Sequence, residues 1–456
     1  MNKEKKKHLF RYSRLWHLLG AYIFFVYRLY YKVIVVTGRE KIPRGVPLIF
    51  APNHQNALMD PLAIHVATGM QTVFLARADI FRKPLLGKIF SWLKILPVYR
   101  IRDGKDNLQQ NEQSFDAAIE VLEHGQPVGL FPEAAHSNKR ALLPMKKGVP
   151  RIAFLAEEKN DFKLGLRIVP AGIYYSRYYN MGGVLHIRFG DPIQVGDFET
   201  EFRDNPQRAH LLLRDVITSG IRPLAIDISK EGWYEIYESI LSLLTRKLAR
   251  GMGRGKHLRT REFEAGKRII AALDHQLETA PEVLEEVRKR VGDYEQMKKK
   301  YRLSDKTLFW RWPVIPGLIA GTGLLLAGLP LFLYGFVNHI LAYFIPQEIV
   351  KKFKDKQFYS SVKFLWGALV VPLLYLLQAA VVWMVAGNFL WALAYLVSLP
   401  LSGLYARWFA EQADFMIRRW RLFFLKQTVP TEMRKLRDLL QGIMAEAESI
   451  VLDYRP

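Results

Sequence analysis

The sequence predicts an α/β fold in which a mixed β-sheet is flanked by helices, followed by a helical linker region and by C-terminal transmembrane helical hairpins. Short apolar, β-branched runs alternate with helical stretches over residues 33–200, which is typical of α/β domains. Apolar residues at three- and four-residue spacing indicate helices over residues 200–305. Two long tracts without a charged residue then occupy residues 313–346 and 364–406.

These patterns divide the chain into five expected parts. They are an N-terminal basic, interfacial membrane helix (1–37), an α/β domain (38–200), a helical basic region (201–310), transmembrane hairpins of about four segments (311–410) and a C-terminal cytoplasmic helical tail (411–456). A chain of 456 residues is too long for one ordinary hydrophobic core, so two or three units are expected.

The composition excludes several classes of protein. The chain has 66 Lys and Arg against 43 Asp and Glu, a net charge of +23, a hydrophobic fraction of 50% and no cysteine. Without cysteine there is no disulfide framework, no thiolate nucleophile and no cysteine metal site. The positive charge favours an anionic partner, either nucleic acid or a lipid surface. The long apolar tracts favour the lipid surface.

The two apolar tracts predict membrane segments. A spanning helix needs about 20 apolar residues, so the second tract holds two helices, divided at residues 386–388. The first is either one long tilted helix or two short ones broken at residues 328–330. All flanks of the tracts are basic, and basic flanks prefer the cytoplasm. Each tract should therefore leave and re-enter the same side, which favours four short segments.

Two further basic regions have alternative interpretations. Lysines precede an aromatic, apolar stretch at residues 15–36, which predicts a helix in the membrane interface; the alternative is an amphipathic helix packed on the next domain. A signal peptide would have a small-residue cleavage site after this stretch, and we find none. The loop at residues 250–261 is basic and contains glycine, which suits nucleic acid or a lipid-facing surface. No nucleic-acid recognition module accompanies it.

The α/β segment has six strand and four helix candidates. The strands are expected at residues 33–36, 48–51, 72–75, 128–131, 168–174 and 185–189, and the helices at 61–67, 84–93, 112–123 and 148–158. Polar residues at the strand ends and in the loops after them are the candidates for a functional site.

The first such strand end contains His54 and Asp60. An imidazole titrates near neutrality, so His54 is a candidate base for a hydroxyl proton, with Asp60 holding its other ring nitrogen. Six residues on an unbroken helix turn through about 600°, roughly 120° off the same face, so the pair needs a bend. Pro61 favours a bend before it. The alternatives are a structural or surface role for His54 and an N-cap role for Asp60.

Three later blocks carry further candidates. Arg100 and Arg102 point the same way on an extended segment and suit a phosphate, although a surface strand edge has the same pattern. Glu133 follows a strand and suits a polyol hydroxyl, and Lys146 at a helix start suits a phosphate; a solvated acidic turn before a basic helix start is the alternative. Pro170 interrupts a strand, which predicts an edge or a close backbone approach.

These four blocks, in this order and at this spacing, resemble the PlsC/glycerol-3-phosphate acyltransferase family of glycerolipid acyltransferases. The lead-in over residues 38–54, with its glycines and prolines, is similar too. The resemblance covers about residues 15–200. It implies direct acyl transfer from a thioester, acyl-CoA or acyl-carrier protein, to a hydroxyl of a glycerol phosphate. It also implies an α/β fold that lies on the cytoplasmic leaflet.

The resemblance assigns roles to single residues. His54 would be the general base and Asp60 its orienting carboxylate. Arg100, with Arg102, would bind the acceptor phosphate. The acceptor-binding block and the turn that follows it match Phe131, Pro132, Glu133, Lys146 and Gly148, and the fourth motif matches Pro170.

The sequence departs from the family pattern in two places. Five residues separate His54 from Asp60, where most members have four; the longer spacing resembles a subgroup that includes yeast-type glycerol-3-phosphate and dihydroxyacetone-phosphate acyltransferases. Ala134 stands where the family usually has glycine, and residues 135–137 replace an expected arginine or serine. These departures leave the reaction type unchanged and the acceptor open.

The sequence therefore predicts a membrane-bound O-acyltransferase of phospholipid biosynthesis with its catalytic domain on the cytoplasmic face. Its expected acceptors are glycerol 3-phosphate, dihydroxyacetone phosphate or lysophosphatidate, its donor is acyl-CoA or acyl-carrier protein, and its membrane partners are anionic lipids rather than nucleic acid. No cofactor and no metal are expected. The alternatives are another lyso-lipid or aminolipid acceptor, or a non-catalytic protein that binds anionic lipid. The lack of cysteine, and of serine or threonine between His54 and Asp60, favours direct transfer without an acyl-enzyme.

Overall fold

The computed structural model describes residues 9, 13–81, 84–98, 107–135, 139–253, 257–309 and 314–454. The chain forms two compact units. The first comprises the chain up to Asp227 together with Ile349–Ala368, and the second comprises Ile228–Glu348 and Leu369–Pro456.

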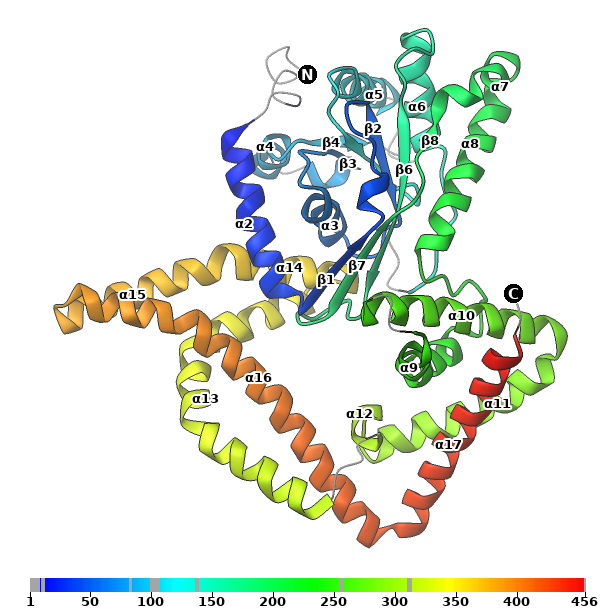
Figure 1. The fold of residues 1–456 in the computed structure, drawn as a ribbon. Coiled ribbons are helices and arrows are strands. Elements are labelled where there is room, and N and C mark those ends of the chain that lie inside the picture. The colour runs from blue at the N-terminus through cyan, green and yellow to red at the C-terminus, as the bar shows by residue number, and fades with distance from the viewer. Residues whose placement is uncertain are drawn as a thin grey trace. The chain divides into compact units, whose positions relative to one another are not determined.

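The first unit is built on an eight-stranded mixed sheet (Figure 1). Its strand order is β1-β7-β6-β2-β5-β3-β4, with β8 paired to β6. The pairs of β6 with β7 and β8 are antiparallel, and all the other pairs are parallel. The strands are β1 (Val33–Thr37), β2 (Leu48–Pro52), β3 (Val73–Arg77), β4 (Ile95–Val98), β5 (Val128–Gly129), β6 (Arg167–Tyr175), β7 (Val184–Phe189) and β8 (Ile193–Gln194).

Helices cover both faces of this sheet. Strand β2 is buried throughout and sends Ile49 and Ala51 into one core, and Leu48 and Phe50 into the other. The first core is completed by α5 (Asn107–Glu123), α6 (Gly148–Lys159) and α8 (Pro206–Ile221). The second is completed by α2 (Arg14–Tyr30), α3 (Met59–Thr68) and α14 (Tyr359–Leu365), which contributes the buried Phe364. The predicted mixed sheet flanked by helices is confirmed.

All six predicted strands and all four predicted helices are present, the second of these helices being α4 (Pro84–Trp92). The sequence analysis missed β4, which contains a proline, and β8, which has only two residues. The first unit also extends beyond the predicted boundary at residue 200. It includes α7 (Glu199–Asp204) and α8, because α8 buries Leu213 and Ile217 against the sheet.

Pro170 corrects one prediction, because β6 is an interior strand and not an edge. The antiparallel partner of β6 changes at this point, from β8 at Ile168 to β7 at Ala171. The Pro170 carbonyl accepts from the N–H of Gly190, so the backbone nitrogen of Pro170 faces the gap between β8 and β7. The missing N–H therefore breaks no ladder hydrogen bond. The predicted close approach is present, because a Cβ on Gly220 would lie 2.8 Å from the Pro170 ring.

Helix α2 shows both of the properties expected of the N-terminal stretch. Tyr27 and Tyr30 are buried in the core beside α3. Leu15, Leu18 and Phe25 are exposed, each to about 60%. One face therefore packs on the domain and the other presents apolar side chains.

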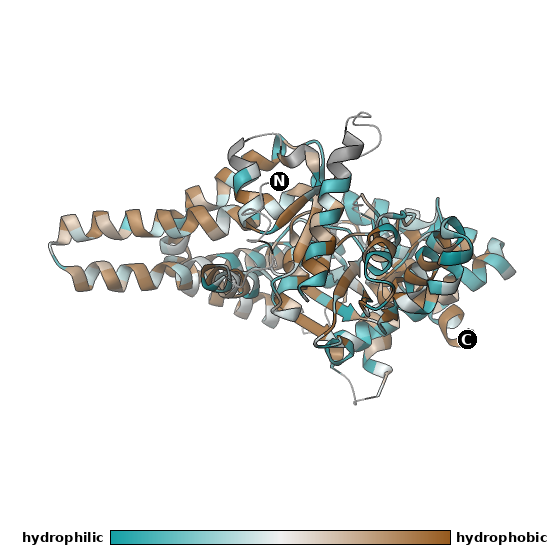
Figure 2. Cartoon of the chain, turned by 90° about the horizontal axis from the view of Figure 1, so that it is seen from above, coloured by the Kyte–Doolittle hydropathy of each residue, from teal (hydrophilic) through white to brown (hydrophobic). Residues whose placement is uncertain are grey.

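The second unit is helical. Four of its helices, α9 (Tyr234–Gly251), α10 (Leu258–Thr279), α11 (Pro281–Lys300) and α17 (Pro430–Asp453), pack on one another, and the short α12 (Asp305–Leu308) follows α11. The long apolar helices are α13 (Val314–Lys351), α15 (Val371–Ala386) and α16 (Phe389–Thr428). Apolar residues predominate in the pair formed by α15 and the start of α16, which extends to the left in Figure 1 and is mostly brown in Figure 2.

Three helical segments are long and apolar enough to cross a membrane: Ile315–Lys351, Lys356–Ala386 and Phe389–Thr428. The division of the second tract is confirmed, since α15 ends at a left-handed Gly387 and α16 begins after the N-cap Asn388. Of the two alternatives for the first tract, the structure has the single long helix, so the described residues contain three candidate spans and not the favoured four short segments. Helix α13 continues through Pro330, which removes only one backbone N–H.

We predict that Gly172→Ala destabilises the first unit. Gly172 lies on β6, and a Cβ there would overlap the backbone carbonyl of Leu224 in the turn after α8. Overpacking against backbone typically costs about 1–3 kcal/mol. The measurement is the unfolding midpoint of the purified chain in denaturant.

Gly196→Ala is the matched control, because its new Cβ would meet only the flexible Gln194 amide at 3.7 Å. Equal midpoints for the two variants would contradict the close packing at Gly172.

Candidate active site

His54 and Asp60 form a hydrogen-bonded pair at the carboxyl end of β2. His54 Nδ1 lies 2.8 Å from Asp60 Oδ2, the His54 side chain is 16% exposed and Asp60 is fully buried. A proton on Nδ1 directed at the carboxylate leaves the lone pair on Nε2. The predicted base and orienting carboxylate are therefore in contact.

The bend that this pair needs is supplied by Ala57. Its φ is 35°, in the left-handed region that a residue with a Cβ rarely adopts. The chain turns there and enters α3, whose first turn contains Asp60. Asp60 is not the N-cap of α3, since that position belongs to Leu58. Its carboxylate accepts from the loop before the helix.

Four donors converge on the buried Asp60 carboxylate. Oδ2 accepts from His54 Nδ1 and from the backbone N–H groups of Gln55 and Asn56, both at 2.7 Å. Oδ1 accepts from the Tyr175 hydroxyl at 2.7 Å. Burial, and then the charge of Asp60, raises the pKa of Tyr175 well above its ordinary value, so Tyr175 remains a donor. A buried carboxylate needs such partners, and these four fix its position.

Glu133 joins two loops at the edge of the site. One of its oxygens accepts from the backbone N–H of His54 at 2.8 Å, and the other accepts from Leu143 at 2.9 Å. The residue is 2% exposed. Burial raises the pKa of Glu133 to about 8, although both N–H groups favour the charged carboxylate. The carboxyl group therefore holds the backbone of the candidate base in place.

The other residues of the third block surround this pair. The Phe131 ring stacks on the His54 ring, with centroids 4.0 Å apart and planes at 22°. Pro132 is buried, and its carbonyl accepts from the N–H of Lys146 at 2.8 Å. The Lys146 side chain is exposed. Gly148 begins α6 directly after this turn.

The remaining predicted site residues are Pro170, Arg100 and Arg102. Pro170 pairs in register with Ala51 on β2, three residues before His54. Arg100 and Arg102 lie outside the described residues, as do residues 136–138. No cluster of three or more metal-ligating side chains occurs among the residues that the structure describes.

The sequence analysis missed a contribution from α14, which lies between the two apolar tracts. Ser360 donates to the side-chain oxygen of Asn56 at 2.5 Å, and Ser361 accepts from the backbone N–H of Leu58 at 3.2 Å. Both serines are buried. Lys363 donates to the carbonyl of Tyr179 at 3.1 Å. The loop from His54 to Asp60 is thus held from outside the α/β segment.

Tyr175 and Asn53 were also missed. Asn53 forms a pair of hydrogen bonds with the backbone of Ile173, at 2.6 and 3.1 Å, which continues the pairing of β2 with β6 past the end of β2. Tyr175 lies two residues further along β6. The signal in the sequence was an Asn immediately before His54, whose amide can mimic a backbone pair.

Comparisons with known proteins find similarity to acyltransferases in the first unit. The sequence model of the Acyltransferase family matches residues 33–174. The chain is 27% identical over 134 residues to Glycerol-3-phosphate O-acyltransferase 1 of Saccharomyces cerevisiae, covering 29% of this chain and 17% of that protein. It is 26% identical over 152 residues to a 1-acyl-sn-glycerol-3-phosphate acyltransferase of Borreliella burgdorferi, covering 33% and 55%.

A solved structure, the 1-acyl-sn-glycerophosphate acyltransferase of Thermotoga maritima, aligns with a TM-score of 0.32 at 19% identity, covering 48% of this chain and 83% of that one. The chain thus spans between about a sixth and about half of the length of the two curated relatives. Residues 33–174 are an acyltransferase domain. The similarity to glycerol-3-phosphate and 1-acylglycerol-3-phosphate acyltransferases lies in this domain.

We predict that the stability of the first unit decreases with rising pH through Glu133. The unfolded pKa of Glu is about 4.3, so the folded state, with a pKa of about 8, binds this proton more tightly. The resulting stabilisation is complete below pH 4 and is lost as the pH rises through about 8. The melting temperature of the wild type, relative to Glu133→Gln, should therefore fall between about pH 5 and pH 8.

Glu158→Gln, an exposed position on α6, is the matched control and should keep the wild-type pH dependence. Parallel melting curves for wild type and Glu133→Gln at every pH would contradict the raised pKa.

We also predict that Ser360→Ala combined with Ser361→Ala loosens the loop from His54 to Asp60. The double variant leaves the Asn56 oxygen and the Leu58 N–H without their partners in α14, and an unsatisfied buried group costs about 1–3 kcal/mol. Hydrogen exchange of the amides between residues 54 and 60 should become faster.

Ser402→Ala is the control, because this buried serine donates to a carbonyl of its own helix, α16. Unchanged exchange in the serine pair variant would show that α14 does not stabilise the loop.

Proposed function

We propose that the chain is a membrane-bound O-acyltransferase that esterifies a hydroxyl of a glycerol phosphate. The acceptor is glycerol 3-phosphate, dihydroxyacetone phosphate or lysophosphatidate, and the donor is a fatty acyl thioester of CoA or of acyl-carrier protein. The observation that carries this proposal is the contact of His54 with the buried Asp60, in a domain whose relatives are named glycerol-3-phosphate and 1-acylglycerol-3-phosphate acyltransferases.

The geometry suits a single displacement. The acceptor O–H proton passes to His54 Nε2 while the oxygen bonds to the thioester carbonyl carbon. The carbon–sulfur bond then breaks, and the departing thiolate takes the proton from His54, which leaves an ester and a free thiol. Asp60 holds the imidazole in the required tautomer and stabilises the imidazolium formed in between. The loop offers no side-chain nucleophile for an acyl-enzyme, since no Ser, Thr or Cys lies between His54 and Asp60.

The phosphate contacts are part of the proposal. Arg100, Arg102 and Lys146 would bind the acceptor phosphate, and Phe131, Pro132, Glu133 and Gly148 would shape the acceptor pocket. We propose that no cofactor takes part and that the catalytic domain lies on the cytoplasmic face, where acyl-CoA and acyl-carrier protein are found. The basic flanks of the apolar tracts support this orientation.

The test is acyl transfer by the purified full-length chain in detergent, with labelled palmitoyl-CoA or acyl-carrier protein and a panel of glycerol phosphates and lysophospholipids. His54→Ala should lower the turnover by about 10²–10⁴-fold, because general-base catalysis contributes that much. His124→Ala, an exposed position at the end of α5, should keep the wild-type rate.

Full activity of His54→Ala would exclude the proposed base. Absence of turnover by the wild type on every acceptor would exclude the reaction class.

A further inference from the structure

The segments that flank the apolar tracts are held by contacts with residues outside the tracts. Helices α9 to α11 precede the first tract, α14 lies between the tracts, and α17 follows the second. Because these contacts lie within one unit in each case, they restrict the paths that the tracts take through a bilayer.

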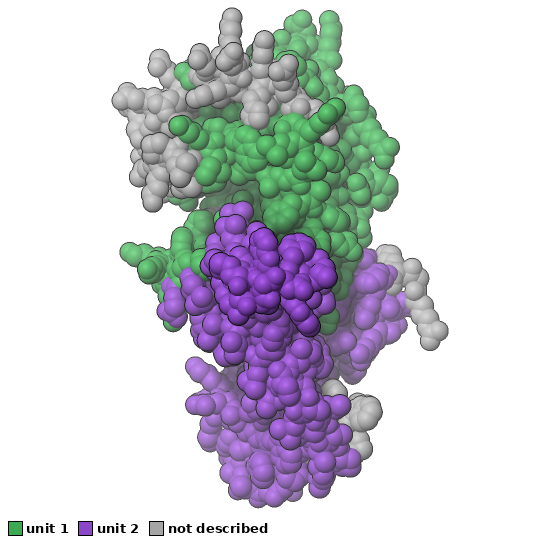
Figure 3. Space-filling view, turned by 90° about the vertical axis from the view of Figure 1, so that its left-hand side faces the viewer, with its two compact units in different colours: residues 1–227, 349–368 green, residues 228–348, 369–456 purple. Residues whose placement is uncertain are grey.

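Helix α14 is fixed to the catalytic domain. Its serines bond to the loop after His54, and its Phe364 is 1% exposed in the core formed with Tyr27 and Tyr30 of α2. Figure 3 therefore colours residues 349–368 with the first unit. The end of α13 must lie on the same side of a membrane as the sheet.

Helix α17 is fixed to the helices that precede the first tract. Arg290 of α11 pairs with Glu446 of α17 at 2.7 Å, and Lys247 of α9 pairs with Glu448. Leu440 and Ile443 of α17 are buried. The chain after the second tract therefore lies on the same side as the chain before the first.

No candidate span occurs in the described residues between the start of α2 and the start of α13. We infer that the chain before α13, helix α14 and helix α17 all lie on one side of the bilayer, so that each apolar tract crosses an even number of times. As one continuous helix, α13 then enters the bilayer from the side of the catalytic domain and returns to it, and its apolar surface contacts the acyl chains of that leaflet.

The surface of α13 fits this environment. No charged residue occurs between residues 314 and 347. Only 6% of the most apolar 18-residue stretch of α13 is buried by protein. Leu324, Leu326 and Val337 are each exposed by more than 60%. One side of α13 contacts α16, where Phe332 stacks on Phe409. The rest of its surface is apolar and exposed, and such a surface requires a lipid environment. A straight helix of 38 residues is about 57 Å long, nearly twice the hydrocarbon thickness, but α13 bends (Figure 1) and contains Pro330 and Pro346.

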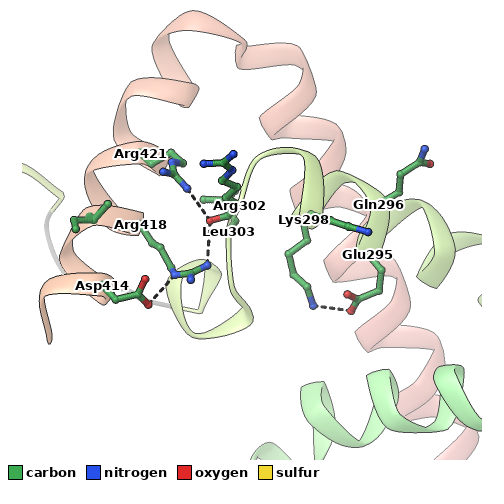
Figure 4. A pocket seen from close by; sticks show the side chains of 10 residues that line it. Glu295, Gln296, Lys298, Arg302, Leu303, Asp414, Arg418 and Arg421 are labelled. Carbon is green, nitrogen blue, oxygen red and sulfur yellow. Dashed lines mark hydrogen bonds and ion pairs between the residues drawn. The ribbon is translucent and has the colours of Figure 1, made fainter. Parts of the chain in front are cut away.

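A cavity lined mainly by basic side chains lies near the start of α13. It has a volume of about 770 Å³ and is lined by five cations and two carboxylates (Figure 4), namely Lys298, Lys299, Arg302, Arg418, Arg421, Glu295 and Asp414. Arg418 and Arg421 both donate to the Arg302 carbonyl, at 3.2 and 3.3 Å.

The neighbouring Arg419 donates to the carbonyl of Gly317, in the first turn of α13. The exposed Ile417 also lines the cavity. Cations beside an apolar side chain at this level fit the phosphate and the first methylene groups of an anionic phospholipid.

The experiment uses the absence of cysteine, since any introduced thiol is the only one in the chain. Single variants Lys289→Cys on α11, Lys354→Cys after α13 and Gln441→Cys on α17 are all at exposed positions. Each is reacted with a membrane-impermeant maleimide in sealed right-side-out and inside-out vesicles. All three should react in the same vesicle orientation and not in the other.

Leu331→Cys, in the middle of α13, should react in neither orientation until detergent is added. Its reaction in detergent shows that the thiol is accessible, and Lys352→Cys repeats the test if Lys354→Cys does not fold. Labelling of Lys289→Cys and Lys354→Cys from opposite sides would show that α13 crosses. Labelling of Leu331→Cys from the side opposite to Lys289→Cys would show two spanning helices in the first tract. Either result overturns the inference.

Discussion

The site depends on one buried carboxylate. Asp60 lies at 0% exposure and accepts hydrogen bonds from an imidazole, two backbone N–H groups and a phenol. A charge without partners at this depth would cost several kcal/mol, so the loop, the helix start and β6 must all adopt their positions for the carboxylate to be tolerated. The left-handed backbone at Ala57 is a consequence, because only this bend brings the amides before α3 back to the helix. Catalytic geometry and local stability therefore have the same origin.

Much of this arrangement can be read from the sequence. The alternation of apolar runs predicts the sheet, and the candidate pairing of His54 with Asp60, six residues apart, requires a bend between them. Both the strands and the bend are determined by residues close together in the sequence. Tyr175, Ser360 and Ser361 could not be predicted, because they meet the loop across 115 to 304 residues of chain, and no local pattern encodes such a contact. Pro170 shows a further limit of prediction from sequence. A proline has no backbone N–H, but only the neighbouring strand at that point determines whether an N–H would be hydrogen-bonded there.

The apolar tracts also separate what hydropathy can predict from what only tertiary contacts reveal. Hydropathy and basic flanks predict that each apolar tract begins and ends on one side. For the first tract the sequence leaves one long helix or two short ones open, and the basic flanks favour two. The structure has one continuous helix there, and α14 and α17 are held by contacts with residues outside the tracts. Hydropathy alone does not encode such tertiary contacts.

The position of α14 in the chain also has a consequence for biosynthesis. The sheet and most of its covering helices are complete once the ribosome has passed Asp227, but the residues that hold the His54 loop are synthesised only after the whole first apolar tract. At ordinary translation speeds this interval is on the order of ten seconds. During this interval the core site for Phe364 has no occupant, and the Leu58 amide and the Asn56 side-chain oxygen have no serine partner. The loop from His54 to Asp60 therefore gains its last contacts only after the first apolar tract has been synthesised.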